Sequence, residues 1–347
     1  MPEASLSPAR AFGLVCGDLP AGPLNTIGDV AGVTVGHKTL TAGDLRTGFT
    51  AIKPHQGNLF REKLVAAVDV INGFGKSAGL IQVEELGTLE TPILLTNTFG
   101  VGTGLHALIK RAIAENPEIG RETGTVNPVV MECNDGHLSD IQALALTEAD
   151  ALFALQSTAP HFEQGSVGAG TGMSAFGFKG GIGSASRVFK LDERTFTLGA
   201  LVLANFGNPG DLILPDGRKP HPKGSGSDPE RGSVIIVLAT DAPLESRQLK
   251  RVARRSGAGL ARLGAYYGNG SGDIALAFST AHKAAHFEER DFISREVLNE
   301  DRIDVLFKAA AETTQEAVLN SMISSPAMHG RGRSNRQSLA DWLRGGR

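Results

Sequence analysis

The chain has 347 residues, of which 44 are glycine, roughly twice the usual share of about 7%. Hydrophobic residues make up 41% and charged residues 20%, which excludes a disordered chain, and the glycines follow no Gly-X-Y period, which excludes a collagen. The 34 basic and 37 acidic residues give a net charge of −3, so we expect binding neither to nucleic acid nor to a membrane through bulk charge.

No secretory signal precedes the first elements, and no run of ~18 apolar residues is present to span a bilayer. The two cysteines, Cys16 and Cys133, cannot build a disulfide framework. We therefore expect a cytoplasmic protein. The nine histidines form no H-E-x-x-H set, and we expect neither a metal nor another cofactor.

Short apolar runs rich in Val, Ile and Leu predict buried strands, with both faces covered because the apolarity is continuous. In chain order, these strands are expected at residues 64–71, 92–96, 128–131, 198–204, 234–239 and 274–278. Apolar residues at helical spacing predict helices over residues 105–116, 244–263 and 305–323, the second beginning near Asp241 and Pro243. The length allows one large domain or two ordinary ones.

Residues 208–232 are rich in proline and glycine and predict an exposed loop or linker, which runs directly into the strongest buried-strand signal of the chain. Ser233 stands at this junction. If the Gly232–Ser233 bond is cut, Ser233 gains an α-amine with a pKa of about 7.7–8.0, suited to general-base catalysis beside its own hydroxyl. The alternative is a serine that merely opens a strand.

Three polar groups at strand ends could serve such a serine. Asn205 ends a predicted strand, where its amide could stabilise an oxyanion, or it could simply form a turn. Ser271 and Asp273 are two residues apart at a strand start and could hold an ammonium group and relay a proton, unless they belong to an ordinary glycine turn. Glu132 follows another strand and could bind a substrate amine, or be one of several solvated acids.

Two other kinds of chemistry are less well supported by the residues. Cys133 has only His137 as a nearby histidine, which argues against a thiol nucleophile. The glycine-rich stretch 165–183 lacks both the G-x-x-x-x-G-K-[ST] pattern and the strand–G-x-G-x-x-G–helix context. We therefore interpret these glycines as close backbone packing around a site, in preference to a phosphate-binding loop.

Together, these motifs resemble the family of L-aminopeptidase/D-Ala-esterase/amidases and β-peptidyl aminopeptidases, over about residues 20 to 325. The matching motifs are Asn25-Thr-Ile-Gly-Asp with Gly36-His, Asn72-Gly-Phe-Gly, Glu90-Thr-Pro-Ile-Leu-Leu-Thr-Asn, Glu132-Cys-Asn-Asp-Gly, Gly168-Ala-Gly-Thr-Gly, Phe178-Lys-Gly-Gly-Ile-Gly, Ala204-Asn-Phe-Gly, Gly232-Ser and Gly270-Ser-Gly-Asp.

The resemblance implies a four-layer αββα sandwich, similar to N-terminal-nucleophile hydrolases but with different connectivity. It implies autocleavage of a single hydrolase domain, residues 1–347, into a larger piece, residues 1–232, and a smaller piece, residues 233–347, followed by assembly into a homo-oligomer, commonly a tetramer. Ser233 would be the nucleophile and Asn205 an oxyanion donor. Ser271 and Asp273 would hold the Ser233 α-amine.

By the same resemblance, Glu132 would bind the free amine of a small peptide, amide or ester. Some members of the family carry a tyrosine after the matched glutamate, whereas this chain has only Tyr266 and Tyr267. Asn134 is our candidate for the second oxyanion donor. The basic segment after residue 325 matches no pattern of the family.

The main hypothesis is therefore an autoprocessed serine aminopeptidase or amidase. One alternative is an amide hydrolase or acyltransferase for non-peptide oligomers or acyl-amino acids that uses the same nucleophile. A second alternative is an uncleaved, non-catalytic binding protein.

Overall fold

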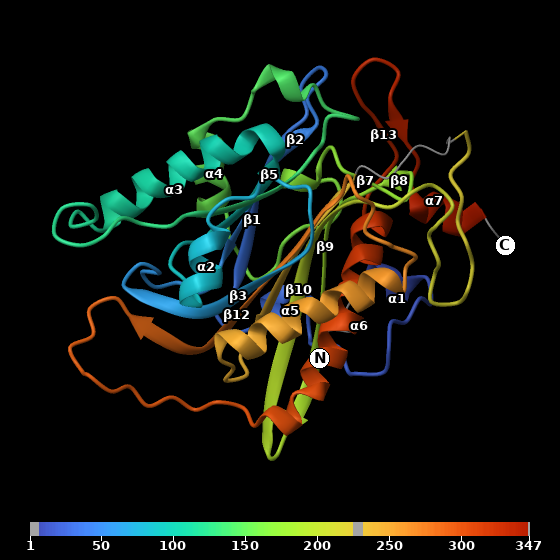
Figure 1. Ribbon diagram of the computed structural model, residues 1–347. Coiled ribbons are helices and arrows are strands. Elements are labelled where there is room, and N and C mark those ends of the chain that lie inside the picture. Colours follow the sequence, from blue (N-terminus) through green and yellow to red (C-terminus); the bar gives the residue numbers. More distant parts are fainter. Residues whose placement is uncertain (1–6, 225–231, 346–347) are drawn as a thin grey trace.

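The computed structural model describes residues 7–224 and 232–345, which form two stacked β-sheets with helices outside them (Figure 1). The first sheet has the order β1-β2-β5-β6 and contains β1 (Thr34–Leu40), β2 (Thr47–Lys53), β5 (Ile93–Asn97) and β6 (Val129–Cys133). The second has the order β4-β3-β12-β11-β10-β9 and contains β3 (Glu62–Gly73), β4 (Thr88–Leu89), β9 (Gly181–Leu191), β10 (Arg194–Asn205), β11 (Ser233–Thr240) and β12 (Gly272–Ala285).

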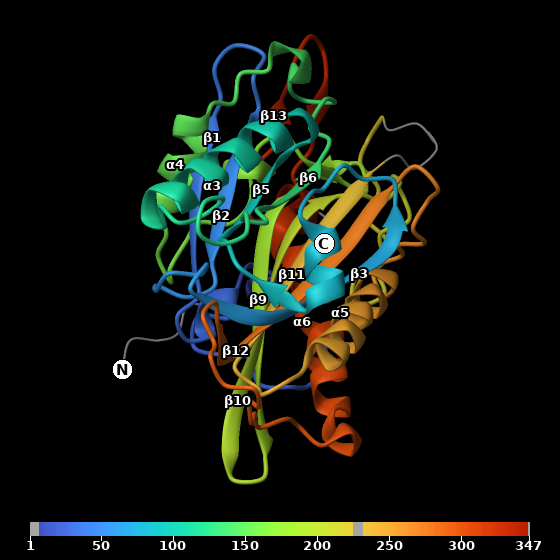
Figure 2. The ribbon, with the colours of Figure 1, turned by 60° about the vertical axis from the view of Figure 1, so that its left-hand side comes forward.

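A pair of long helices covers the outer face of each sheet. α3 (Val101–Glu115) and α4 (Glu148–Gln156) pack on the first sheet, and α5 (Ser246–Ala261) and α6 (Asp304–Ile323) pack on the second. Figure 2 shows the resulting order of helices, sheet, sheet and helices. The predicted four-layer αββα sandwich is confirmed. The short elements are α1 (Pro8–Ala11), α2 (Leu80–Leu86), β7 (Ser174–Ala175), β8 (Phe178–Lys179), β13 (Met328–His329), β14 (Asn335–Arg336) and α7 (Leu339–Gly345).

The continuous apolarity of β11 follows from its place in the middle of the second sheet. Ile235 and Val237 point into the core between the two sheets, whereas Ile236 and Leu238 point into the core under α5 and α6. Because successive side chains of a strand face opposite sides, a strand covered on both sides has to be apolar at every position.

All six predicted strands and all three predicted helices are present. Sequence analysis missed β1, β2 and β9, because polar residues and glycines interrupt the apolar pattern of these strands. It also missed the helix α4. The start of α5 was placed too early. Glu245 caps this helix and forms a reciprocal capping box with Gln248, so the helix begins at Ser246.

The predicted loop after Asn205 is irregular, but it is not simply exposed. Leu212 and Leu214 are buried in the core beneath α5 and α6, and this anchors the loop as far as Gly224. Residues 225–231 of the predicted loop lie outside the described residues. The loop was predicted to be exposed because it is rich in proline and glycine, but its two leucines still bury their side chains where the core is nearby.

α6 lies unusually close to β9, and a buried ion-pair cluster joins the two elements. A side chain at Gly183 would overlap the Ala317 carbonyl, so only glycine allows this approach. The guanidinium of Arg187 donates to Glu312 Oε2 at 3.0 Å and to Glu316 Oε2 at 2.8 Å, and all three side chains are fully buried. These contacts fix the outer helix layer behind the strands that carry the candidate site.

Among the described residues, no helix combines the length and apolarity that crossing a bilayer requires.

Candidate active site

The candidate nucleophile lies where the ends of three neighbouring central strands of the second sheet meet. Ser233 is the first residue of β11, opposite Asn205 at the end of β10 and beside Gly272 at the start of β12. Strand pairing therefore brings together three of the predicted site segments, although they are distant in sequence. Ser233 is buried.

The carbonyl oxygen of the peptide bond before Ser233 accepts two hydrogen bonds. Ser233 Oγ donates to the Gly232 carbonyl oxygen at 2.6 Å, and the Gly272 N–H donates to the same oxygen at 3.3 Å. A side chain at Gly232 would overlap the Asn205 carbonyl and the Phe206 main chain, so this position has to be glycine. The predicted scissile carbonyl is thus hydrogen-bonded twice and lies next to a hydroxyl.

Ser271 and Asp273 point toward each other, as their spacing predicts. Ser271 Oγ donates to Asp273 Oδ1 at 2.7 Å, and both side chains are almost completely buried. The preceding turn is held by Asn72, whose amide donates to the carbonyls of Gly268, at 3.0 Å, and of Ser271. The pair is therefore a fixed hydroxyl–carboxylate unit at the start of β12, the strand that adjoins Ser233.

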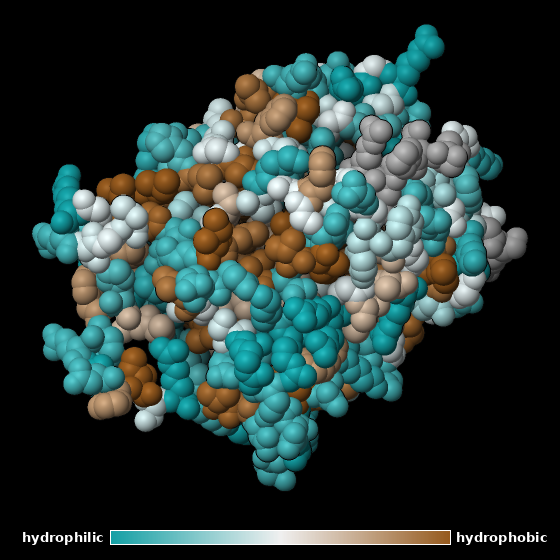
Figure 3. Space-filling view, viewed as in Figure 1, coloured by the Kyte–Doolittle hydropathy of each residue, from teal (hydrophilic) through white to brown (hydrophobic). Residues whose placement is uncertain are grey.

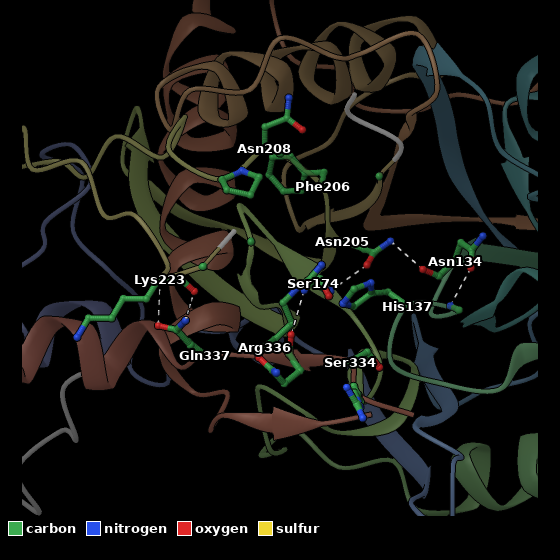
Figure 4. A pocket seen from close by; sticks show the side chains of 18 of the residues that line it. Asn134, His137, Ser174, Asn205, Phe206, Asn208, Lys223, Ser334, Arg336 and Gln337 are labelled. Atoms are coloured by element: carbon green, nitrogen blue, oxygen red, sulfur yellow. Dashed lines mark hydrogen bonds between the residues drawn. The ribbon is translucent and has the colours of Figure 1, made fainter. Parts of the chain in front are cut away.

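The amide of Asn205 is fixed by one hydrogen bond on each of its polar atoms (Figure 4). The Ser174 N–H donates to Asn205 Oδ1 at 2.9 Å, and Asn205 Nδ2 donates to the Asn134 carbonyl at 3.0 Å. A side-chain amide carries two N–H groups, and among the described residues only one of those of Asn205 donates a hydrogen bond. The arrangement suits an oxyanion donor that keeps its orientation during a reaction.

Asn134, the predicted second donor, lies beside Asn205 on the wall of a pocket. Its main-chain carbonyl orients Asn205, and its own Oδ1 accepts the Gly136 N–H at 2.8 Å. Neither tyrosine lies in the segment just after Glu132: Tyr266 Oη accepts from the pocket residue Asn208 at 2.7 Å, and Tyr267 Oη donates to the Gly257 carbonyl.

Glu132, near the end of β6, is a buried carboxylate with both oxygens held. Thr98 Oγ1 donates to Oε2 at 2.5 Å, and the Lys76 N–H donates to Oε1 at 2.7 Å. A side chain at Gly75 would lie 3.7 Å from Glu132 Oε1 and 3.8 Å from Gly272 Cα. The carboxylate therefore lies on the β12 side of Ser233.

Cys133 is not suited to be a nucleophile. It is a free, buried cysteine, and its Sγ lies 3.6 Å from the Leu203 carbonyl oxygen. Burial raises the pKa of the thiol well above its ordinary value, and the nearby charges of Glu132 and Asp273 raise it further. Because the thiolate is the reactive form, this pKa shift suppresses thiol chemistry.

Sequence analysis missed Lys179, which organises the glycine-rich segment behind Asn205. The ammonium group is fully buried and donates to the carbonyls of Gly170, Met173 and Gly180 at 2.8–3.0 Å. Burial lowers its pKa to about 7. Lys179 thus shapes the turn that presents Ser174 to Asn205, and the only sequence signal was a lone lysine within a run of glycines.

The unmatched basic segment forms one wall of the site. A cavity of about 890 Å³ opens beside Asn205 and Gly232, and residues 333–337 of the C-terminal hairpin line it together with residues 206–209. Gln337 ties the hairpin to the preceding loop, because its amide donates to the Lys223 carbonyl at 2.8 Å. The segment therefore belongs to the site. In the part of the chain that the structure describes, no group of three or more His, Cys, Asp or Glu residues is arranged to hold a metal.

Solved structures with this architecture define the class of protein. The chain is 44% identical to a protein from Pyrococcus horikoshii OT3, with a TM-score of 0.91 and 98% of both chains covered. It is 37% identical to the L-aminopeptidase D-Ala-esterase/amidase from Ochrobactrum anthropi, with a TM-score of 0.88 and 96% of both chains covered. The latter is described as a prototype for the serine aminopeptidases and a new variant among the Ntn hydrolase fold. The chain thus has an Ntn-hydrolase-like fold.

The chain belongs to peptidase family S58, whose sequence profile matches residues 25–336. It is also 36% identical to the β-peptidyl aminopeptidase BapA from Sphingosinicella microcystinivorans, over 93% of this chain and 87% of that protein. The family match continues through the basic segment to residue 336, beyond the limit near residue 325 that sequence analysis expected. The protein is therefore a peptidase, and the resemblance noted in the sequence is confirmed.

Proposed function

We propose that this peptidase is a serine aminopeptidase that first cuts its own Gly232–Ser233 bond and then uses Ser233 as its nucleophile. The proposal rests above all on one observation: Ser233, Asn205 and the Ser271–Asp273 region meet at the ends of three neighbouring strands. The names of its relatives support peptides, amides and esters as substrates.

Self-cleavage begins with attack of Ser233 Oγ on the Gly232 carbonyl carbon. The C–N bond breaks, the Ser233 nitrogen takes up a proton, and an ester joins Gly232 to Oγ. Water then hydrolyses this ester, which leaves a carboxylate on Gly232 and a free hydroxyl and α-amine on Ser233. The Gly272 N–H, which donates to the Gly232 carbonyl, would stabilise the charge that develops on that oxygen.

The two pieces would remain one folded unit after cleavage. β11 and β12 of residues 233–347 lie between β10 and β3 of residues 1–232 in the second sheet. Separating the pieces would break hydrogen bonds along both sides of this pair of strands and expose the core. The cut is therefore expected to free a reactive terminus without dismantling the fold.

In the mature enzyme, the Ser233 α-amine takes the proton from Oγ as Oγ attacks the substrate carbonyl. Asn205 stabilises the oxyanion, and the amine or alcohol of the substrate leaves with the transferred proton. Water then hydrolyses the ester on Ser233 and restores the hydroxyl. Ser271 and Asp273 hold the α-amine and assist proton transfer, and Asn134 lies close enough to Asn205 to assist at the oxyanion.

Glu132 would bind the free amine of the substrate and so restrict cleavage to the first residue. A buried carboxylate attracts an ammonium group strongly because little water screens the pair. Thr98 and the Lys76 N–H fix its two oxygens and leave lone pairs for a ligand.

Replacing Glu132 with glutamine tests this role. We expect kcat/KM for L-alanine p-nitroanilide to fall by about 30-fold or more, because removing one partner of a buried charge pair costs roughly 2–5 kcal/mol. The N-acetylated substrate should resist the wild-type enzyme, since it has no ammonium group. The variant should still show two bands on a denaturing gel, which serves as the control for folding. Equal cleavage of free and acetylated substrates by the wild type would contradict an aminopeptidase.

We also propose that the protein is a cytoplasmic homo-oligomer, as tetramers are common in similar proteins. Figure 3 shows apolar side chains gathered on the face that carries α2. Ile81 and Leu86 of α2 each expose more than half of their surface, and large exposed apolar patches are typical of interfaces. Both cysteines are free and buried, which suits a reducing compartment. Light scattering that gives the mass of a single cleaved unit would contradict the oligomer.

A further inference from the structure

The pocket beside Asn205 carries positive charge on its described lining. Lys223, Arg333 and Arg336 contribute to the wall, whereas none of the described lining residues is Asp or Glu. This imbalance stands out in a chain whose total charge is −3. It is the pattern expected of a site for an anionic group.

Arg336 is the cation most closely integrated into this wall. Figure 4 shows it on β14, on the side of the pocket that also carries Ser174, His137 and Asn205. One guanidinium nitrogen, Nη1, donates to the Asn335 carbonyl at 3.0 Å. Its Nε is buried and has no hydrogen-bond partner among the described residues, and the same is true of Ser174 Oγ.

The half-buried guanidinium of Arg336 has hydrogen-bonding capacity left for an anion. Burial holds the pKa of Arg336 below its ordinary value, and no carboxylate among the described residues forms an ion pair with it. Arg336 Nε and the Ser174 hydroxyl are both buried without a hydrogen-bond partner among the described residues, and an unsatisfied buried polar group destabilises the folded protein. A planar carboxylate would satisfy them, because arginine binds it through parallel N–H groups.

The position of Arg336 relative to Ser233 indicates which carboxylate would bind. Glu132 lies on the β12 side of Ser233, whereas Ser174 and Asn205 lie on the β10 side. A substrate whose amine is at Glu132 and whose carbonyl is at Ser233 therefore extends its leaving group toward Arg336. Neighbouring strands are about 4.8 Å apart, so Asn205 is one strand spacing from Ser233, and the wall that carries Arg336 lies on this side of the scissile carbonyl.

We infer that Arg336 binds the free C-terminal carboxylate of a short peptide substrate and makes the enzyme prefer di- and tripeptides over their C-terminal amides. The inference rests on the proposed aminopeptidase function and adds a specificity residue to the leaving-group side. A second carboxylate could also reach the pocket, namely that of Gly232 after self-cleavage, because Gly232 lines the same cavity. The test has to separate these two sources.

The experiment compares L-alanyl-L-alanine with L-alanyl-L-alanine amide as substrates of the full-length, matured enzyme. Release of alanine or alaninamide is followed by chromatography for the wild type, Arg336→Met and Arg336→Lys. Arg344→Met is the matched control, because Arg344 is an exposed arginine of α7 that pairs with Asp341 and does not line the pocket.

For the wild type, we expect kcat/KM to be about 10- to 100-fold higher for the dipeptide than for its amide, mainly through KM, as for a charge-assisted hydrogen bond. In Arg336→Met this ratio should fall to near one, and Arg336→Lys should restore part of it. Arg344→Met should keep the wild-type ratio.

Equal kcat/KM for the two substrates in the wild type would overturn the inference and leave the proposed aminopeptidase intact, since both substrates would be cleaved. An equal loss of kcat/KM for both substrates in Arg336→Met would also overturn it. That result would mean that Arg336 binds the Gly232 carboxylate or supports folding. Failure of the wild type to cleave either dipeptide would refute the proposed function itself, and the inference with it.

Discussion

Replacing Ser233 with alanine is expected to leave a single 36.3 kDa chain that hydrolyses no aminoacyl substrate. The variant lacks the hydroxyl that donates to the Gly232 carbonyl, so no ester can form and the peptide bond stays intact. Activity should fall by roughly 10⁶-fold, the usual loss when a serine nucleophile is removed. A denaturing gel and a p-nitroanilide assay measure the two effects together.

The matched control is Ser246→Ala, which removes a serine hydroxyl at the start of α5, away from the pocket. This control should be cut and active like the wild type. Two bands from Ser233→Ala would show that another group cleaves the chain. Full activity in an uncut Ser233→Ala chain would remove Ser233 from the mechanism altogether.

Replacing Asn205 with alanine is expected to lower kcat by about 10²- to 10³-fold with little change in KM, as found when one oxyanion donor is removed. The amide would act only when negative charge develops on the substrate oxygen, so its loss should affect the transition state more than binding. Steady-state kinetics of protein confirmed by gel to be fully cleaved measures this effect. Slower self-cleavage is expected as well, because Asn205 pairs with Ser233 in the sheet.

Asn208→Ala is the control, because this asparagine also lines the pocket but donates to Tyr266. Its kcat should stay within about threefold of the wild type, in line with the small effect of most surface substitutions. A change confined to KM in Asn205→Ala would assign the amide to substrate binding and contradict an oxyanion role.

The parts of the fold that the sequence predicted well share one physical property. β11 and β12 are buried on both faces and are therefore apolar throughout, which makes them visible as short continuous runs. β9 escaped prediction because polar side chains lie on both of its buried faces, Ser184 and Ser186 on one and Arg187 on the other, and partners outside the strand compensate their polarity. A single sequence does not show such partners.

The same contrast applies to the candidate site. Ser271 and Asp273 are neighbours in sequence, and their hydrogen bond follows from strand geometry. The contacts of Asn205 with Ser174 and Asn134 depend on how β7 and β6 meet β10, which local patterns do not encode. Arg336 was missed for the same reason, because only the folded C-terminal hairpin brings it to the pocket.

The glycine excess has several structural causes, and many of the glycines simply have positive φ angles that other residues rarely adopt. Gly232 and Gly272 lie at the candidate site, where neighbouring main chains leave no room for a side chain. Gly183 meets α6 and Gly36 meets α4, where helices pack closely on the sheets, far from the reacting bond. The expectation that the glycines surround the nucleophile therefore holds only for part of them.

The central claim is that Ser233 becomes the first residue of the smaller piece and the nucleophile of the mature enzyme. N-terminal sequencing of the bands that the purified wild type gives on a denaturing gel tests it most directly. We expect two bands, the smaller of which begins Ser-Val-Ile-Ile. A single uncut chain, or a smaller band that begins at any other residue, would contradict it.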